Sequence, residues 1–493
     1  MNAIQESYEA LPYPHCVHPL SHPARLAAVG KVLGYQAADV ARARVLDIGC
    51  GSASSLLAMA ARMPECQFTG IDFSGPDIAS AQELAREAGL TNVEFQQADL
   101  MDWNPSGAKF DFIIAYGFFS WVPDEMKDRL FQLIAECLAP RGIACVSYMT
   151  YPGCKQPEAL RDLLKLHTDS LQDPMEKVAT AHRTLDFLDR AWKGVPNFAH
   201  SSYLREEAKR IRQKEPHFLL HDDLDVERDP CYLLQFTNWA AEHGLYYLGE
   251  SEFHTMLLEN LPLESGKELA AMGLDRLQTE QLIDYITNRA FRCSLLVGAQ
   301  AALPALLDAQ ALRGLSIRSS LKPVSKTKPG AEDRFLTAQG SKFTLRSVPL
   351  VAFVRELAMQ PEACLPFQEV LSKAQTTVGQ VFDEAAQAQL AEDLLTLYAK
   401  RHIEISALAF IPPTSLPEYP CLTRLNLAMC RHRGIIVDAH HGTIPLSPAQ
   451  IAFCLQLDGS LSLSDLGQKH RSHQPFLASL NRLGCLLQPE PQA

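Results

Sequence analysis

Residues 44–51 read Arg-Val-Leu-Asp-Ile-Gly-Cys-Gly, and this motif is the strongest indication of the fold class. Its first half is an apolar run, which is typical of a short strand buried in a parallel sheet. Gly49 and Gly51 follow the run, and glycine lets a backbone turn sharply and approach a ligand closely. Open α/β sheets bind their ligands at the carboxyl ends of such strands. We therefore predict a ligand site at this turn.

Further strand patterns follow, separated by helical patterns. A helix is predicted over 53–63, another after the N-cap residue Ser74, and a third after Pro123. The alternation indicates an α/β fold with a doubly wound, Rossmann-like parallel sheet. The strands are predicted at 44–48, 67–72, 93–99, 110–115 and 143–149, with 245–248 and 291–297 completing the sheet.

The chain has 493 residues, which suggests about three domains at roughly 150 residues each. A polar helical insertion is expected to interrupt the sheet, and two small winged-helix-like α+β modules are expected at the C-terminal end. We predict linkers at Ser316–Asp333 and at the prolines of 412–420, and a long helix around Val378–Lys400. The predicted segments are an N-terminal arm and helix (1–40), the core of the sheet (41–154), the helical insertion (155–230), the completion of the sheet (231–300), a middle domain (301–411) and a C-terminal small domain (412–493).

The composition excludes several classes of protein. Lys and Arg number 45 against 57 Asp and Glu, giving a net charge of −12, so general nucleic-acid binding is not expected. The 13 cysteines form no C-x-x-C pair and the N-terminus carries no signal-peptide pattern, which favours reduced thiols in the cytoplasm. No apolar stretch reaches the roughly 20 residues of a membrane span.

Three aspartates specify the ligand. Asp72 ends the second strand, where it can accept hydrogen bonds from a ribose diol, and Asp99 ends the third, where it can accept one from an adenine amino group. NAD is disfavoured, because its fingerprint would need glycine at Ser54 and because Asp47 beside a ligand favours a cation over a pyrophosphate. S-adenosylmethionine fits, since it carries an ammonium and a sulfonium but no phosphate.

Residues 40–150 resemble a class I S-adenosylmethionine-dependent methyltransferase through this combination of glycines and aspartates. The resemblance implies that Gly49 and Gly51 contact the methionine moiety of the cofactor, that Asp72 contacts the ribose and that Asp99 contacts the adenine. The complete set of cofactor-binding residues that it implies is Asp47, Gly49, Cys50, Gly51, Asp72, Phe73, Asp99, Leu100 and Tyr116.

A second set of motifs covers most of the chain. It comprises Tyr8 with Leu11-Pro12-Tyr13-Pro14, then Ser120-Trp121-Val122-Pro123, Ser147-Tyr148, Tyr151-Pro152-Gly153, His221-Asp222-Asp223-Leu224, His243-Gly244-Leu245-Tyr246-Tyr247-Leu248 and Arg289-Ala290-Phe291-Arg292. The set resembles bacterial methyltransferases that carry a methyltransferase regulatory domain, among them protein-lysine methyltransferases of outer-membrane proteins. The resemblance also implies a possible homodimer. The sequence departs from these relatives at Met149, often Asn, and at Cys154, often Trp.

Methyl transfer from this cofactor depends mainly on in-line positioning of the acceptor. A lysine acceptor has an unperturbed pKa near 10.4 and must first lose a proton, which an aromatic, desolvated pocket favours. We predict that Tyr116, Trp121 and Tyr148 form that pocket. His221 with Asp222 is a candidate pair to orient or deprotonate the acceptor. The alternative is that Asp222 caps the next helix while His221 packs in the interior.

Other histidines and lysines are assigned no chemistry. His15, His18 and His22 lack accompanying cysteine or carboxylate ligands, so no metal site is predicted. His440 and His441 are expected in a solvated turn. Three lysines of the predicted linker are expected to be solvated charges that do not form a nucleic-acid-binding patch: Lys322, Lys326 and Lys328.

The sequence therefore predicts an S-adenosylmethionine-dependent methyltransferase whose acceptor is a protein lysine side chain. Two alternatives stay open at this point. One is a methyltransferase for a small molecule or a carrier-bound intermediate of a natural product, and the other is a regulatory protein that binds S-adenosylmethionine without turnover.

Overall fold

The structure, a computed structural model, describes residues 11, 15–193, 199–224, 228–298, 307–324 and 332–488. Tyr8, Pro12, Tyr13 and Pro14 of the N-terminal motif, together with Lys326 and Lys328, lie outside the described residues.

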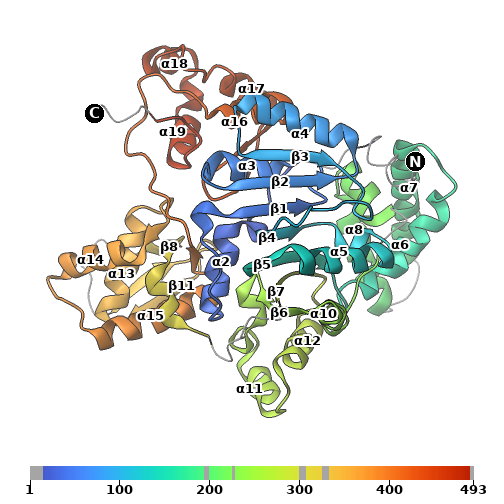
Figure 1. Cartoon of the computed structure of the whole chain (residues 1–493), viewed down its shortest axis with the longest axis horizontal. Coiled ribbons are helices and arrows are strands. Elements are labelled where there is room, and N and C mark those ends of the chain that lie inside the picture. Colours follow the sequence, from blue (N-terminus) through green and yellow to red (C-terminus); the bar gives the residue numbers. More distant parts are fainter. Residues whose placement is uncertain are drawn as a thin grey trace.

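A seven-stranded mixed sheet forms the centre of the molecule, with strand order β3-β2-β1-β4-β5-β7-β6 (Figure 1). The first five strands are parallel, whereas β7 lies antiparallel to both β5 and β6. The predicted Rossmann-like fold class is confirmed. The strands are β1 (Arg44–Ile48), β2 (Gln67–Asp72), β3 (Val93–Gln97), β4 (Phe110–Ala115), β5 (Leu138–Met149), β6 (Leu245–Glu250) and β7 (Phe291–Gly298).

Helices cover both faces of this sheet, because successive side chains along a buried strand point to opposite faces. Val45 packs on one face with α2 (Pro23–Val32), α3 (Ser54–Arg62) and α4 (Gly75–Ala88). The neighbouring Leu46 packs on the other. That second face is covered by α5 (Asp124–Cys137) and α10 (Leu233–Glu242).

The helical insertion follows β5 and forms a layer of its own beside the sheet (Figure 1). It contains α6 (Lys155–Thr168), α7 (Pro174–Lys193), α8 (Ala199–Arg212) and α9 (Pro216–Phe218). Apolar residues from α6, α7 and α8 form a separate small core. The insertion ends in a π-helical segment at Leu219–Leu224.

The chain then returns to the sheet. The two late strands that the sequence predicted are present and fill its far edge. The helices between them are α11 (Leu263–Ala271) and α12 (Arg276–Thr287).

Two small sheets follow, and here one prediction is wrong and the start of a predicted helix is shifted. The expected linker at Ser316–Asp333 begins with β8 (Ser316–Ser319), which is the central strand of the sheet β12-β8-β13 because Ile317 buries its side chain there. The expected long helix is present over Glu384–Ala399 but begins six residues later than predicted, because Gly379 ends the preceding helix in the left-handed conformation and Asp383 caps this one.

The elements of this middle region are β9 (Lys322–Pro323), β10 (Glu332–Leu336), β11 (Lys342–Arg346), α13 (Val348–Met359), β12 (Leu365–Pro366), α14 (Phe367–Val378), α15 (Glu384–Ala399) and β13 (Ile403–Ser406). Strands β9, β10 and β11 form the second small sheet. The winged-helix character of the two C-terminal modules stays a prediction.

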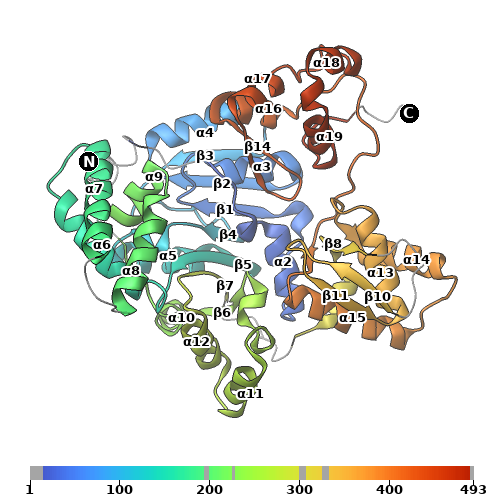
Figure 2. The same cartoon turned by 180° about the vertical axis from the view of Figure 1, so that it is seen from behind.

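The C-terminal module, residues 412–488, contains a helix, a hairpin and three further α-helices. Its first helix lies against α4 and α3 of the main sheet (Figure 2). Leu425 and Met429 of that helix belong to the same apolar core as the sheet. The elements are α16 (Arg424–Arg433), β14 (Ile435–Val437), β15 (Thr443–Pro445), α17 (Pro448–Cys454), α18 (Leu463–Lys469) and α19 (Gln474–Arg482).

None of the helices in the described ranges combines the length and apolar character that a membrane crossing requires.

Candidate functional site

The glycine turn after β1 leaves open space at the carboxyl edge of the sheet. Gly49 and Gly51 have φ of +71° and +51°, a region that favours glycine. A Cβ at Gly49 would lie 2.6 Å from the Phe118 ring, so that position requires glycine for packing as well. A Cβ at Gly51 would meet no atom within 4 Å. The turn therefore presents bare backbone to a space that a ligand can enter.

Asp72 ties the end of β2 to this turn. Its Oδ2 accepts a hydrogen bond from the Gly51 amide (2.7 Å), and its Oδ1 accepts one from the Ser74 amide (2.8 Å). Burial raises the pKa of Asp72, and the two amides act against that rise. Each carboxylate oxygen has a second lone pair. Asp72 can therefore hold the turn and still accept hydrogen bonds from a ligand diol.

Asp47 is a buried carboxyl group that lies near a second carboxylate, that of Asp72. Its side chain is 7% exposed, and burial, followed by the nearby Asp72 carboxylate, raises its pKa to about 8. Within the described part of the chain, the one charged neighbour that acts on this pKa is a second carboxylate. A ligand cation would relieve this repulsion and favour the ionised form of Asp47. The two carboxyl groups, Asp47 and Asp72, thus fit a positively charged ligand such as S-adenosylmethionine.

The remaining predicted cofactor contacts differ in exposure. Asp99 is exposed after β3, and its Oδ1 accepts a hydrogen bond from the Met101 amide (2.9 Å). Phe73 is 41% exposed, whereas Leu100 is buried in the core. Burial raises the pKa of the Cys50 thiol well above its usual value, so this thiol stays protonated.

Of the three predicted aromatic residues, Tyr116 and Trp121 follow β4 and are half-buried. The Tyr116 ring stacks on His18, with centroids 4.1 Å apart, and packs against the core that contains α3. Burial raises the pKa of Tyr116 strongly, so the phenol stays neutral.

Tyr148 lies on the opposite face of the sheet. It is 1% exposed, its ring stacks on Phe236 at 4.1 Å, and its hydroxyl shares a hydrogen bond with Ser294 Oγ (3.1 Å). The structure therefore places Tyr148 in the core beneath α10 and does not bring it to Tyr116.

We expect the Tyr148→Phe variant to lose about 1 kcal/mol of unfolding free energy, the usual net value of one buried hydrogen bond. Turnover should stay within about twofold of the native rate, because the hydroxyl does not reach the site. Chemical denaturation and a methyl-transfer assay measure the two quantities. A strongly slowed variant of native stability would contradict this placement.

His221 and Asp222 lie in the π-helical segment at the end of the insertion. The His221 Nε2–H donates to the Leu11 carbonyl (2.6 Å), and Lys214 Nζ lies 3.3 Å from Asp222 Oδ2. His221 is buried, as the alternative reading of the sequence expects. The expected helix cap at Asp222 is wrong, because α10 begins after Tyr232. His221 thus joins the insertion to Leu11 of the N-terminal arm, whereas the ion pair of Asp222 lies within the insertion.

The sequence reasoning missed a cluster around Ser52 and Ser55 at the start of α3. His441, expected in a solvated turn, is 4% exposed and shares a hydrogen bond with Ser55 Oγ (2.8 Å). His15 Nδ1 shares one with Ser52 Oγ (2.8 Å). The local sequence around His441 carries only turn signals, so nothing in it announces a contact with a helix almost 400 residues earlier. Among the described residues, no group of three or more His, Cys, Asp or Glu side chains is arranged to hold a metal ion.

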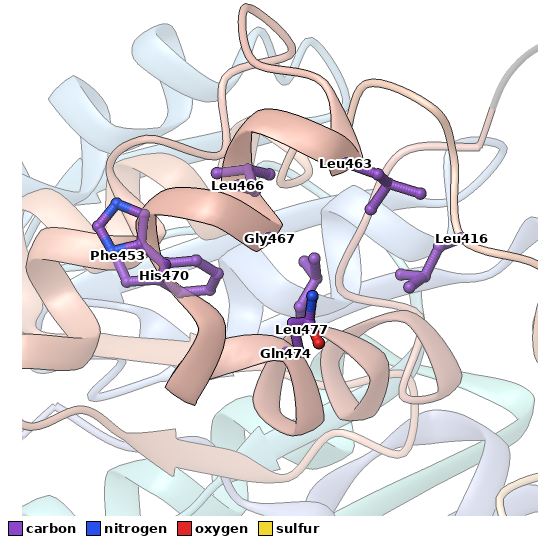
Figure 3. A pocket seen from close by; sticks show the side chains of 8 residues that line it. All are labelled: Leu416, Phe453, Leu463, Leu466, Gly467, His470, Gln474 and Leu477. Atoms are coloured by element: carbon purple, nitrogen blue, oxygen red, sulfur yellow. The ribbon is translucent and has the colours of Figure 1, made fainter.

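A separate apolar cavity of about 260 Å³ lies inside the C-terminal module (Figure 3). Its walls come from α17, α18, α19 and the segment before them, so it is not part of the strand-end site. The lining residues are Leu416, Phe453, Leu463, Leu466, Gly467, His470, Gln474 and Leu477.

Two families match the chain. The family described as "Methyltransferase domain" matches residues 45–142, and the family described as "Predicted methyltransferase regulatory domain" matches residues 215–298. The first match contains the glycine turn with Asp72 and Asp99, and the second contains β6, α12 and β7.

Similar proteins occur in Rickettsia. An uncharacterized protein of Rickettsia prowazekii is 27% identical over 412 residues, which cover 82% of this chain and 74% of the relative. A second uncharacterized protein of that organism is 30% identical over 236 residues, 48% of this chain and 94% of the relative. The solved structure of PKMT2 from Rickettsia typhi superposes with a TM-score of 0.82 at 25% identity, covering 94% of this chain and 91% of that chain.

PKMT2 has also been solved in complex with AdoHcy, S-adenosylhomocysteine, and that structure superposes with a TM-score of 0.81. The fold, the glycine turn and both family matches point to one class of enzyme. The chain belongs to the S-adenosylmethionine-dependent methyltransferases that carry a methyltransferase regulatory domain.

Proposed function

We propose that this methyltransferase transfers the methyl group of S-adenosylmethionine to the amine of a lysine side chain in a protein. The observation that carries the proposal is the likeness to PKMT2, a protein lysine methyltransferase, over 94% of the chain. The likeness includes the insertion and both C-terminal modules, and is not confined to the sheet that all such enzymes share.

We assign the cofactor contacts from the geometry of the strand ends. The Gly49–Gly51 turn receives the methionine moiety, and Asp47 faces its cationic groups. Asp72 accepts from the ribose hydroxyls and Asp99 from the adenine amino group. Three further residues near these strand ends, Cys50, Phe73 and Leu100, border the nucleoside.

The acceptor amine must reach the cofactor as a neutral nucleophile. Tyr116 and Trp121 follow β4 at the same edge as the glycine turn, and we assign them to the acceptor pocket. Aromatic walls desolvate the lysine and so lower its pKa, while their faces attract the sulfonium. S-adenosylmethionine supplies an already activated methyl group, so the task of these side chains is to desolvate and align the amine.

Binding of S-adenosylmethionine near neutral pH is expected to release protons from Asp47. The pKa of Asp47 is about 8 in the structure, so most of this carboxyl is protonated at pH 7. A cation beside it favours the carboxylate, and release approaches about 0.9 proton per site at pH 7 if the pKa falls well below 7. Affinity should therefore rise as the pH rises toward 8. Calorimetry in buffers of different protonation enthalpy measures the released protons.

The Asp47→Asn variant is the control for this measurement. It removes the carboxyl from the proton balance while leaving the titration of the cofactor's own amino group in place. The difference in proton release between the two proteins therefore reports Asp47. Equal release by both would remove Asp47 from the cofactor site.

The acceptor is tested with isotope-labelled cofactor. Cells that express the native chain or the Asp72→Asn variant are compared, and proteins are searched by mass spectrometry for methyl-sized increments on lysine. Label in protein lysines that depends on the native chain supports the proposal. Label confined to the small-molecule fraction would overturn it and favour a small-molecule or carrier-bound acceptor.

The cellular location, the class of partner and the oligomeric state of the enzyme are proposals as well. All 13 cysteines are unpaired in the structure, which fits the cytoplasmic location that we propose. The chain's net charge of −12 favours a protein partner over nucleic acid. A homodimer stays a prediction from the family resemblance.

A further inference from the structure

The C-terminal module reaches the segment that leads from the glycine turn into α3. Arg433, the last residue of α16, extends its guanidinium to this segment. Its Nη2 donates to the Ser52 carbonyl (2.6 Å) and its Nη1 donates to Ser54 Oγ (2.6 Å). Both acceptors lie within three residues of Gly51.

The N-terminal arm and the hairpin of the module meet at the same segment. Ser55 Oγ accepts a hydrogen bond from the His18 amide (3.3 Å) and shares another with His441 Nε2 (2.8 Å). The Val17 amide donates to Thr443 Oγ1 (2.9 Å), which joins the arm to the hairpin directly. Residues 51–55 therefore lie between the N-terminal arm and the C-terminal module, and both contact them.

The Arg433 guanidinium is in a largely desolvated position. Burial lowers its pKa to about 10, although nearby Asp77 acts in the opposite direction. A desolvated cation needs its hydrogen-bond acceptors, because leaving it unpaired costs far more than it would in water. The fixed fork of an arginine also restricts where its two acceptors can lie. Arg433 thus fixes the positions of Ser52 and Ser54 relative to α16.

We propose that Arg433 is a positioning residue for the methionine end of the cofactor, and that the C-terminal module thereby forms part of the cofactor site. This inference rests on the proposed assignment of the Gly49–Gly51 turn to the methionine moiety. Arg433 acts through the turn and through the start of α3. The nucleoside end of the site, at Asp72 and Asp99, makes no contact with this arginine in the described residues.

The test compares ligands with and without the amino-acid portion of the cofactor. S-adenosylmethionine, S-adenosylhomocysteine and 5′-methylthioadenosine, which lacks that portion, are titrated calorimetrically into the full native chain and the Arg433→Gln variant. Loss of two charge-assisted hydrogen bonds to the turn should weaken the first two ligands by about tenfold or more. Binding of 5′-methylthioadenosine should change by less than about twofold.

The matched control is Arg431→Gln, from the same helix and the same interface. Arg431 pairs with Glu87 of α4, away from the glycine turn. This variant should bind all three ligands as the native chain does. If Arg433→Gln fails to fold, the Ser54→Ala variant is used, because it removes one acceptor of the same arginine. It should weaken the same two ligands and spare 5′-methylthioadenosine, with a smaller loss of affinity.

The outcomes separate the two proposals. Native affinity for S-adenosylmethionine in Arg433→Gln, or an equal loss for 5′-methylthioadenosine, overturns the role of Arg433. The assignment of the turn itself fails differently: the native chain would then bind 5′-methylthioadenosine as tightly as it binds S-adenosylmethionine.

Discussion

The Arg292→Met variant is expected to lower the free energy of unfolding by about 3 to 5 kcal/mol, the cost of removing one partner from a buried ion pair. Arg292, on β7, is fully buried. Its guanidinium binds Asp284 of α12 through Nε (2.9 Å) and Nη2 (2.8 Å), and its Nη1 donates to Glu250 of β6 (2.7 Å). Its Nη1 also lies 3.6 Å from the buried Glu280, so the variant leaves three buried carboxylates without this cation.

Urea denaturation of the full chain measures the loss. The control is Lys373→Met on α14, which removes the cation of an exposed pair with Glu369. An exposed helical pair four residues apart contributes about 0.3 to 0.5 kcal/mol, so this variant should be almost native. Equal stability of both variants would show that methionine packs in place of Arg292 and that the network adds nothing net.

The Asp72→Asn variant should weaken S-adenosylmethionine binding by about 1 to 3 kcal/mol, or roughly 5- to 150-fold. Two effects combine in this prediction. The variant removes the charge that we assign to the ribose hydroxyls, and its single carbonyl oxygen can accept from only one of the two amides, Gly51 or Ser74, that now donate to Asp72. The backbone around the glycine turn and Ser74 then loses one of its two hydrogen bonds to the end of β2.

Calorimetric titration measures this affinity, and Asp111→Asn is the matched control. Asp111 also accepts a hydrogen bond from a backbone amide, that of Arg44 (2.9 Å), but it lies at the start of β4 and hence at the opposite edge of the sheet. The Asp111→Asn variant should therefore bind S-adenosylmethionine with native affinity. Unchanged affinity in Asp72→Asn would exclude Asp72 from the site.

The strand ends could be predicted because their signals are local. Apolar runs followed by glycine or aspartate specify both a buried parallel strand and its carboxyl end. Parallel strands bring those ends to one edge, so Asp47 and Asp72 are neighbours even though 25 residues separate them. The N-cap at Ser74 followed from the same kind of local pattern.

Tyr148 shows where local signals were not enough. Along β5, Ala144 and Val146 pack on the face that α5 and α10 cover, and the two-residue period places Tyr148 with them. Cys145 packs on the opposite face. The alternation was present in the sequence, but a strand with apolar residues on both faces does not reveal which face borders the site.

The contacts of Arg433 and His441 could not be predicted from the sequence. Both depend on how the C-terminal module packs on α3 and α4, and this packing joins residues far apart in the chain. The same holds for the antiparallel placement of β7 between β5 and β6. Long-range pairings of this kind leave no periodic pattern in either partner.

The distance in sequence between Ser54 and Arg433 has a consequence for biosynthesis. A ribosome adds about 5 to 20 residues per second, so the 379 positions between them take roughly 20 to 75 s to translate. During that time the nascent sheet lacks the arginine that we propose to position its glycine turn. Full affinity for the methyl donor is therefore acquired only after the segment that contains Arg433 has been translated.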